Sequence, residues 1–170
     1  MRTAKIYIDG ANIFYAQKKV GWSLDWAKVK AEFETERTIA QWRYYVGLKS
    51  GDDPMQNYLK YLDAIGFTAF TKPLKSIKVS GPSAPPSGII YKANFDVEMT
   101  ADILLDKSKL DEVIIFSGDS DFAYLVKKLR DTGTRVTIFA FRKTIAWELK
   151  LAATKVIYLD DLKSDLQRLK

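Results

Sequence analysis

Four aspartates are the residues of this chain whose type and spacing suggest chemistry, namely Asp9, Asp96, Asp119 and Asp121. Carboxylates gathered in one place repel one another unless a cation neutralises them or some of them stay protonated. Hard oxygen ligands of this kind favour Mg²⁺ or Mn²⁺. Magnesium keeps open positions for water and phosphoryl oxygens, so the residue types point to a metal site that acts on a phosphate substrate.

Two absent residue types narrow the chemistry further. The chain has no histidine, which removes the commonest general base and the commonest nitrogen ligand for transition metals. It also has no cysteine, which excludes thiol nucleophiles, thiolate metal sites and disulfides. Hydrolysis would therefore have to use carboxylates, lysines, hydroxyls or a metal-bound water.

Length and charge limit the kind of protein and partner. The 170 residues suit a single domain over 1–170, and the composition is that of a folded protein. The chain carries 27 basic and 21 acidic residues, a net charge of +6. Such a surplus favours a polyanion such as nucleic acid as partner, and the alternative is solubility charge spread evenly over the surface.

The chain contains no apolar run of the kind that targets or anchors a protein. Its first residues lack the apolar stretch of a signal peptide, and nowhere do roughly 18 apolar residues follow one another. We therefore expect a cytoplasmic protein that does not bind membranes.

The elements that must position the four aspartates follow an alternating pattern. Short β-branched or aromatic runs alternate with segments of helical period, which predicts an α/β domain with three layers, α/β/α, around a mainly parallel sheet of Rossmann-like type. Strands are expected at about 5–8, 42–48, 67–71, 112–116, 135–141 and 156–159. Helices are expected from about 12, at 24–33, from 53 to the glycine at 66, at 96–104, from 122 to the glycine at 133, and at 145–152.

The start of the helix near residue 53 has a clear sequence signal. Asp53 is expected to cap it, with Pro54 at the first helical position and Gln56 three residues after the cap.

The segment 72–92 interrupts the α/β pattern with glycines, serines and four prolines. It is predicted to be a loop or a protruding hairpin. Between residues 64 and 95 there are four lysines and no acid, so this stretch carries much of the basic surplus. Two interpretations remain open for it: contact with phosphates, or a mobile surface loop without function.

The predicted elements bring the acids toward one edge of the sheet. Asp9 and Asp119 each follow a strand, and sites in parallel sheets form at the carboxyl ends of the strands. Asp96 lies in the first turn of its helix on the side that borders the core, where an acid needs a partner. Any one of these acids alone is explained by a helix cap or a turn. Three acidic clusters in register with the strands favour a shared metal instead.

Three motifs of this sequence resemble a known family. They are Ile8-Asp9-Gly10-Ala11-Asn12-Ile13, Lys92-Ala93-Asn94-Phe95-Asp96-Val97-Glu98-Met99 with Asp102, and Ser117-Gly118-Asp119-Ser120-Asp121-Phe122. Together they resemble the NYN domains, LabA-like branch, of the PIN-like nuclease superfamily. The match runs in order over nearly the whole chain.

The resemblance implies a Rossmann-like fold and Mg²⁺- or Mn²⁺-dependent cleavage of RNA. It assigns metal binding and catalysis to Asp9, Asp96, Asp119 and Asp121. Asn12 would position Asp9 or the substrate. Asp102 matches a further acid of the family. Because it lies six residues beyond Asp96, it points away from that face of the helix, and it would either support the metal ligands or have a purely structural role.

The remaining substrate contacts follow from charge and position. Ser117 and Ser120 are expected to hold a phosphate, together with the amides at the start of the helix after Asp121. Lys92 and Arg142 are expected to add positive charge, and the RNA is expected to be single-stranded.

Two positions depart from the family pattern. Ala93 stands where the family often has glycine, and Thr154 stands where an aspartate is frequent. Neither position supplies one of the four expected metal ligands.

Two alternatives to a nuclease stay open. One is an RNA-binding or regulatory module without catalysis, or a subunit of a homo-oligomer. The other is a phosphatase like the haloacid dehalogenases, because Gly118-Asp119-Ser120-Asp121 resembles the magnesium loop of that class. That class usually has a second acid two residues after the aspartate that ends the first strand. In this chain that aspartate is Asp9, and the position two residues later is Ala11.

Overall fold

A six-stranded parallel sheet forms the centre of the protein. The computed structural model describes residues 1–83 and 85–169. The strand order is β3-β2-β1-β6-β7-β8, and every pair in the sheet is parallel. The strands of this sheet are β1 (Arg2–Asp9), β2 (Arg37–Leu48), β3 (Phe67–Pro73), β6 (Glu112–Phe116), β7 (Arg135–Ala140) and β8 (Lys155–Tyr158).

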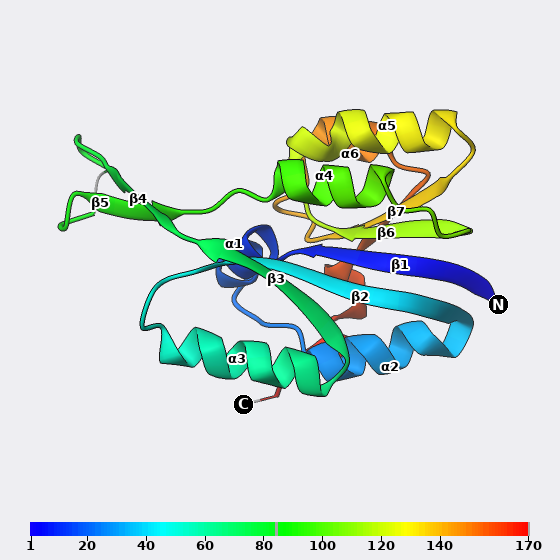
Figure 1. Cartoon of the computed structure of the whole chain (residues 1–170), viewed down its shortest axis with the longest axis horizontal. Helices are drawn as coiled ribbons and strands as arrows, with labels where there is room; N and C mark the ends of the chain where they lie inside the picture. The colour runs from blue at the N-terminus through cyan, green and yellow to red at the C-terminus, as the bar shows by residue number, and fades with distance from the viewer. Residues whose placement is uncertain (84, 170) are drawn as a thin grey trace.

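Helices cover both faces of this sheet (Figure 1). One face carries α1 (Gly10–Val20), α2 (Trp26–Glu36), α3 (Asp53–Ala64) and α7 (Lys163–Leu166). The other face carries α4 (Asp96–Leu104), α5 (Ala123–Asp131) and α6 (Trp147–Ala152). Two short 3₁₀ helices, η1 (Ser120–Phe122) and η2 (Leu159–Leu162), complete these layers. The predicted three-layer α/β class is therefore confirmed.

Strand β1 shows why the sheet separates two cores. Ile6 and Ile8 enter the cluster under α2, whereas Tyr7 enters the cluster under α4 and α5, because successive side chains of a strand point to opposite faces. Since both faces are covered, all five residues of β6 are buried and the strand is a continuous apolar run after Glu112.

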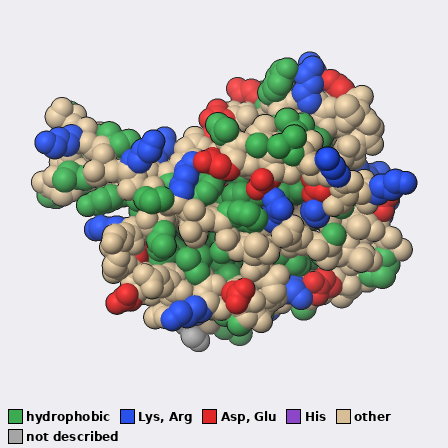
Figure 2. Space-filling model, in the orientation of Figure 1, with side chains coloured by type: hydrophobic (Ala, Val, Ile, Leu, Met, Phe, Trp, Pro, Cys, Tyr) green, Lys and Arg blue, Asp and Glu red, His purple; other side chains and the backbone are tan. Residues whose placement is uncertain are grey.

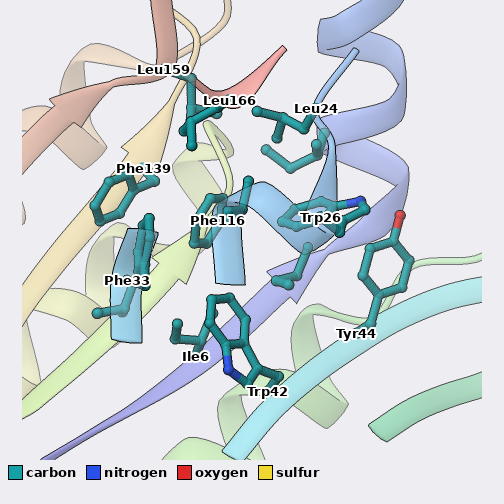
Figure 3. Close-up of a cluster of buried hydrophobic side chains, with 14 of the residues drawn as sticks. Ile6, Leu24, Trp26, Phe33, Trp42, Tyr44, Phe116, Phe139, Leu159 and Leu166 are labelled. Carbon is teal, nitrogen blue, oxygen red and sulfur yellow. The ribbon is translucent and has the colours of Figure 1, made fainter. Parts of the chain in front are cut away.

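Aromatic rings fill the larger core (Figure 3). Phe33 of α2 lies 4.7 Å from Phe139 of β7, and Phe116 of β6 stacks on Phe139 at 5.0 Å between ring centroids. Trp26 makes edge contacts with Phe116 at 5.6 Å. Rings at these separations add about 0.5–1.5 kcal/mol per pair beyond their buried area, so this cluster holds the central strands in register.

A two-stranded antiparallel hairpin extends away from the sheet, as Figure 1 shows on the left. It consists of β4 (Lys75–Lys78) and β5 (Ile89–Lys92), and we call residues 74–92 the arm. Of the two forms expected for segment 72–92, the structure has the protruding hairpin.

Several expected boundaries are wrong, and three of them have a clear local reason. The cap of α3 is Asp52, whose side chain accepts from the Met55 amide, so Asp53 already belongs to the helix. Helix α2 begins two residues after Leu24, since Asp25 caps it through two backbone amides. Strand β2 begins at Arg37, and its first residues pair with β1 although they are not strongly buried, so they gave no apolar signal.

No helix within the described part of the chain is both long and apolar enough to cross a membrane.

Candidate metal centre

Asp9 is the last residue of β1 and directly precedes α1. Its side chain caps α1, with Oδ1 accepting from the Asn12 amide at 3.0 Å. Gly10 follows because a side chain does not fit there: a Cβ would lie 2.6 Å from the Tyr45 carbonyl oxygen and 2.6 Å from the Tyr44 ring. The tight packing of Gly10 against β2 therefore fixes the direction in which Asp9 leaves the strand.

The loop after β6 is tied to the loop after β1 by two hydrogen bonds. The Gly118 amide donates to Asn12 Oδ1 at 2.9 Å, and Ser117 Oγ donates to Asp9 Oδ2 at 3.2 Å. Parallel pairing places Ile8 opposite Phe116, so Asp9 and Ser117 leave the sheet side by side. The same Ser117 oxygen accepts from the Asp119 amide at 3.1 Å. One buried hydroxyl thus aligns the two acidic loops.

Asp96 reaches this edge from the other layer. It is the first residue of α4, and its amide donates to Asn94 Oδ1 at 2.7 Å. Phe95, just before it, packs its ring edge-on against Tyr45 at 5.8 Å between centroids. This anchoring positions the Asp96 carboxylate over the edge of the sheet.

The three acids converge. One carboxylate oxygen from each of Asp9, Asp96 and Asp119 lies within 4.8 Å of the other two. Oxygens bound to one Mg²⁺ at about 2.1 Å lie within about 4.2 Å of one another, so small side-chain rotations would bring these three onto a single ion. The donor set, carboxylates without histidine or cysteine, suits Mg²⁺ or Mn²⁺.

Burial and mutual repulsion disfavour the charged state of two of these acids. Burial, opposed by the hydrogen bonds from Asn12 and Ser117, raises the pKa of Asp9 to about 6. Burial together with the charges of Asp119 and Asp121 also raises the pKa of Asp96. A divalent cation would relieve both effects, because it replaces lost hydration and offsets the like charges.

Asp121 and Asp102 occupy different places from these three acids. Asp121 is exposed, and the three-carboxylate group does not include it, although it adds to the charges that raise the pKa of Asp96. The Asp121 backbone amide donates to Asp119 Oδ1 at 3.1 Å, which caps the turn η1. The Asp102 carboxylate accepts from Tyr45 at 2.6 Å and pairs with Arg43 at 2.9 Å, so it braces β2 against α4.

The residues expected to touch substrate are placed differently from one another. Ser117 is fully buried, so its hydroxyl serves Asp9 and Asp119, and the expected phosphate contact is not open to it. Asn12 holds the two loops together through its side chain. Ser120 is exposed beside Asp119.

Lys92 and Arg142 lie on either side of this region. Lys92 is exposed at the end of β5 in the arm, four residues before Asp96. Arg142 follows β7 and is exposed, but its guanidinium pairs with Asp161 at 2.7 Å and lies 4.0 Å from the centre of the Tyr158 ring. Its charge is therefore partly engaged.

Sequence reasoning did not identify the supporting residues Asn94, Arg43 and Tyr45. Asn94 was detectable, because an asparagine two residues before an acid at a helix start is a known local turn. Arg43 and Tyr45 gave no such signal, since their contact with Asp102 joins residues far apart in the chain.

Comparison with known proteins gives a consistent result. The model of the family described as NYN domain matches residues 3–160. The chain is 34% identical over 167 residues to "Low amplitude and bright protein LabA" of Synechococcus elongatus, covering 96% of this chain and 87% of that protein.

A solved structure shares the fold. It is the crystal structure of a protein of unknown function, VPA0982, from Vibrio parahaemolyticus, which superimposes with a TM-score of 0.78 at 22% identity. The match covers 98% of this chain and 96% of that one. With the family model matching nearly the full length and a relative above 30% identity, this chain belongs to the NYN domain family.

Proposed function

We propose that this protein is a ribonuclease that uses Mg²⁺ or Mn²⁺ to hydrolyse phosphodiester bonds of RNA. The observation that carries the proposal is the approach of three carboxylates, from Asp9, Asp96 and Asp119, to within 4.8 Å at the carboxyl edge of a parallel sheet. Membership of a nuclease-like family and the net charge of +6 support it. The same membership weighs against the phosphatase alternative.

Each of the three acids has a distinct support that would orient it toward an ion. Asp9 is held by the Asn12 amide and Ser117, Asp119 by the start of η1, and Asp96 by the first turn of α4. A bound divalent ion supplies a water of lowered pKa and offsets charge on phosphate oxygens. Because such a site needs no histidine base, it agrees with the composition of the chain.

Asp121 has a separate part in this proposal. Its carboxylate is exposed and near Asp96, so it is suited to accept a hydrogen bond from the attacking water or to complete the ligand set. Ser120, exposed in the same turn, is suited to donate a hydrogen bond to a phosphate oxygen.

The test is cleavage of labelled single-stranded RNA by the full chain in Mn²⁺, compared with Asp119→Asn. The substitution keeps the size of the side chain but removes a charged ligand, so we expect cleavage to fall at least about 100-fold, as for loss of a group that stabilises the transition state. Asp131→Asn, an exposed acid at the end of α5, is the matched control and should cleave as wild type does.

Two outcomes would overturn the proposal. One is equal cleavage by wild type and Asp119→Asn, which would indicate a contaminating nuclease. The other is RNA binding with no products in either metal, together with Mn²⁺ binding that Asp119→Asn leaves unchanged. That result would favour a binding module without catalysis.

A further inference from the structure

The arm is an unusually basic projection next to the three carboxylates. Residues 64–95 contain four lysines and no acid, and Figure 2 shows lysines along the arm on the face in view. The arm follows β3 directly, so it leaves the sheet from the same carboxyl edge as the acids. Charge of one sign on a projecting element attracts ligands of the other sign.

The pairing of the hairpin places two lysines opposite each other. Lys75 pairs with Lys92, and Ile77 pairs with Ile90, so these four side chains share one face of the ribbon. Like charges directly opposite each other on a ribbon are destabilising. Within residues 1–83 and 85–169, no carboxylate lies within ion-pair distance of Lys75 or Lys92. No carboxylate of the described residues therefore balances the positive charge of this face.

A groove lies along this face and the residues that lead into α4. It has a volume of about 480 Å³, and its lining includes Lys72, Lys75, Ile77, Lys92, Asn94 and Glu98. Asn94 is also the residue whose side chain accepts from the Asp96 amide. The lining of the groove therefore includes a residue that contacts the backbone of Asp96. Lys72 is already engaged, because it pairs with Glu98 at 2.6 Å, which leaves Lys75 and Lys92 as its available charges.

The base of the arm is fixed relative to the sheet. Leu74 and Ala93 pack over Gly47 of β2, where a Cβ would lie 2.2 Å from Leu74 and 2.8 Å from Ala93. The Leu74 amide also donates to the Leu48 carbonyl at 3.0 Å. Packing this close holds the lysine pair at a set position beside the acids.

We infer that the face formed by Lys75, Ile77, Ile90 and Lys92 binds the phosphate backbone of a single-stranded RNA and leads it to the carboxylates. The inference rests on the proposed function for the choice of RNA. The lysines pair with successive phosphates, while Ile77 and Ile90, 42% and 39% exposed, offer an apolar contact to bases or riboses. A two-stranded ribbon cannot read the deep, narrow major groove of an RNA duplex, so an unpaired strand is the better fit.

The experiment measures binding apart from cleavage. Fluorescence anisotropy with a labelled single-stranded oligouridylate, in EDTA and over a series of salt concentrations, compares wild type with Lys75→Ala/Lys92→Ala. Each phosphate contact contributes about 0.7 to the slope of log K against log salt for single strands. The double variant should therefore lose about 1.4 from that slope and bind about 20-fold more weakly near 0.1 M salt.

Two further variants separate binding from folding and from total charge. Lys107→Ala/Lys109→Ala removes two exposed lysines from the loop before β6, at the opposite edge of the sheet, and should bind as wild type does. Lys75→Glu places an acid opposite Lys92, which improves the pairing of the hairpin but should weaken RNA binding more than Lys75→Ala.

The outcomes distinguish this inference from the proposed function. Equal slopes for the wild type and the arm variant, or equal losses in the arm and control variants, would overturn the inference even if Asp119→Asn abolishes cleavage. Weaker binding in the arm variant alone would support it even if no cleavage occurs. If the arm variant weakens binding to double-stranded RNA or to anionic vesicles but not to the single strand, the occupant is different and the inference is wrong.

Discussion

Replacing Asp9 by asparagine should stabilise the metal-free protein at neutral pH, although it removes a proposed metal ligand. The folded protein raises the pKa of Asp9 from 3.8 to about 6, chiefly by burial. Between these two values the folded state binds more protons than the unfolded state, so stability falls as pH rises. The loss of stability caused by the buried Asp9 charge is absent below pH 3.8, grows up to about pH 6 and is complete above that pH.

The size of this effect follows from the shift. Raising the pKa of Asp9 from 3.8 to about 6 lowers the free energy of unfolding by about 3 kcal/mol at pH 8. Asparagine keeps an oxygen for the Asn12 amide, but its amide group replaces the oxygen that accepts from Ser117, which costs about 1 kcal/mol. The net gain expected for Asp9→Asn in EDTA at pH 8 is therefore about 2 kcal/mol, or about 4–8 °C in Tm.

The assay is urea unfolding of wild type and variant in EDTA at about pH 8 and about pH 4.5. The gain should shrink by about 2 kcal/mol at the lower pH, where the native carboxyl is largely protonated. Asp25→Asn, a change at the cap of α2, is the control and should not reproduce the gain at pH 8. Mn²⁺ should stabilise wild type and not Asp9→Asn. Equal destabilisation by Asp9→Asn at both pH values would refute the reasoning that Asp9 is a desolvated charge.

Three other substitutions have outcomes fixed by the structure. Gly10→Ala should lower the free energy of unfolding by at least about 2 kcal/mol, because its Cβ would lie 2.6 Å from the Tyr45 carbonyl oxygen. Thermal unfolding measures this loss, and an unchanged Tm would contradict the tight packing. The effect of burial on the pKa of Asp106 is outweighed by hydrogen bonds from Lys5, Ser108 and Tyr7, which lower that pKa. Its ionised carboxylate therefore stabilises the folded protein above about pH 4, and this stabilisation is lost as pH falls. Asp106→Asn should therefore destabilise the protein at neutral pH and flatten its acid unfolding curve, and parallel curves for the two proteins would exclude this role. Glu112→Ala should cost about 3–5 kcal/mol in urea unfolding, since it leaves the Arg37 guanidinium, which lies 3.1 Å from Glu112, without its buried partner. A loss as small as that of the exposed Glu36→Ala would count against it.

The three layers of the fold, and the approach of Asp9 to Asp119, could be predicted from the sequence. Asp9 and Asp119 each follow a strand with a strong apolar signal, and parallel strands end at one edge. Their neighbourhood depends on β1 pairing with β6, which the alternating pattern allowed but did not specify. Asp96 was predictable as an acid bordering the core, but its approach over the sheet depends on contacts of Phe95 with Tyr45.

The contacts that sequence reasoning missed are those set by orientation or by distance in the chain. Asp121 lies only two residues from Asp119, yet its side chain is exposed and lies outside the three-carboxylate group. Ser117 was expected to hold a phosphate, but it is fully buried and its hydroxyl donates to Asp9. No local pattern distinguishes these directions, because Ser117 and Asp121 are both polar residues of the loop and turn that follow β6.

The hairpin between β3 and α4 has a consequence for how such a protein diversifies. In its outer half the Val79 amide donates to the Gly88 carbonyl at 2.9 Å, whereas its inner end is packed over Gly47. Insertions, deletions or exchanged side chains beyond Lys78 would leave the acidic centre intact. Changes in this outer half can therefore alter what the arm contacts without altering the three carboxylates.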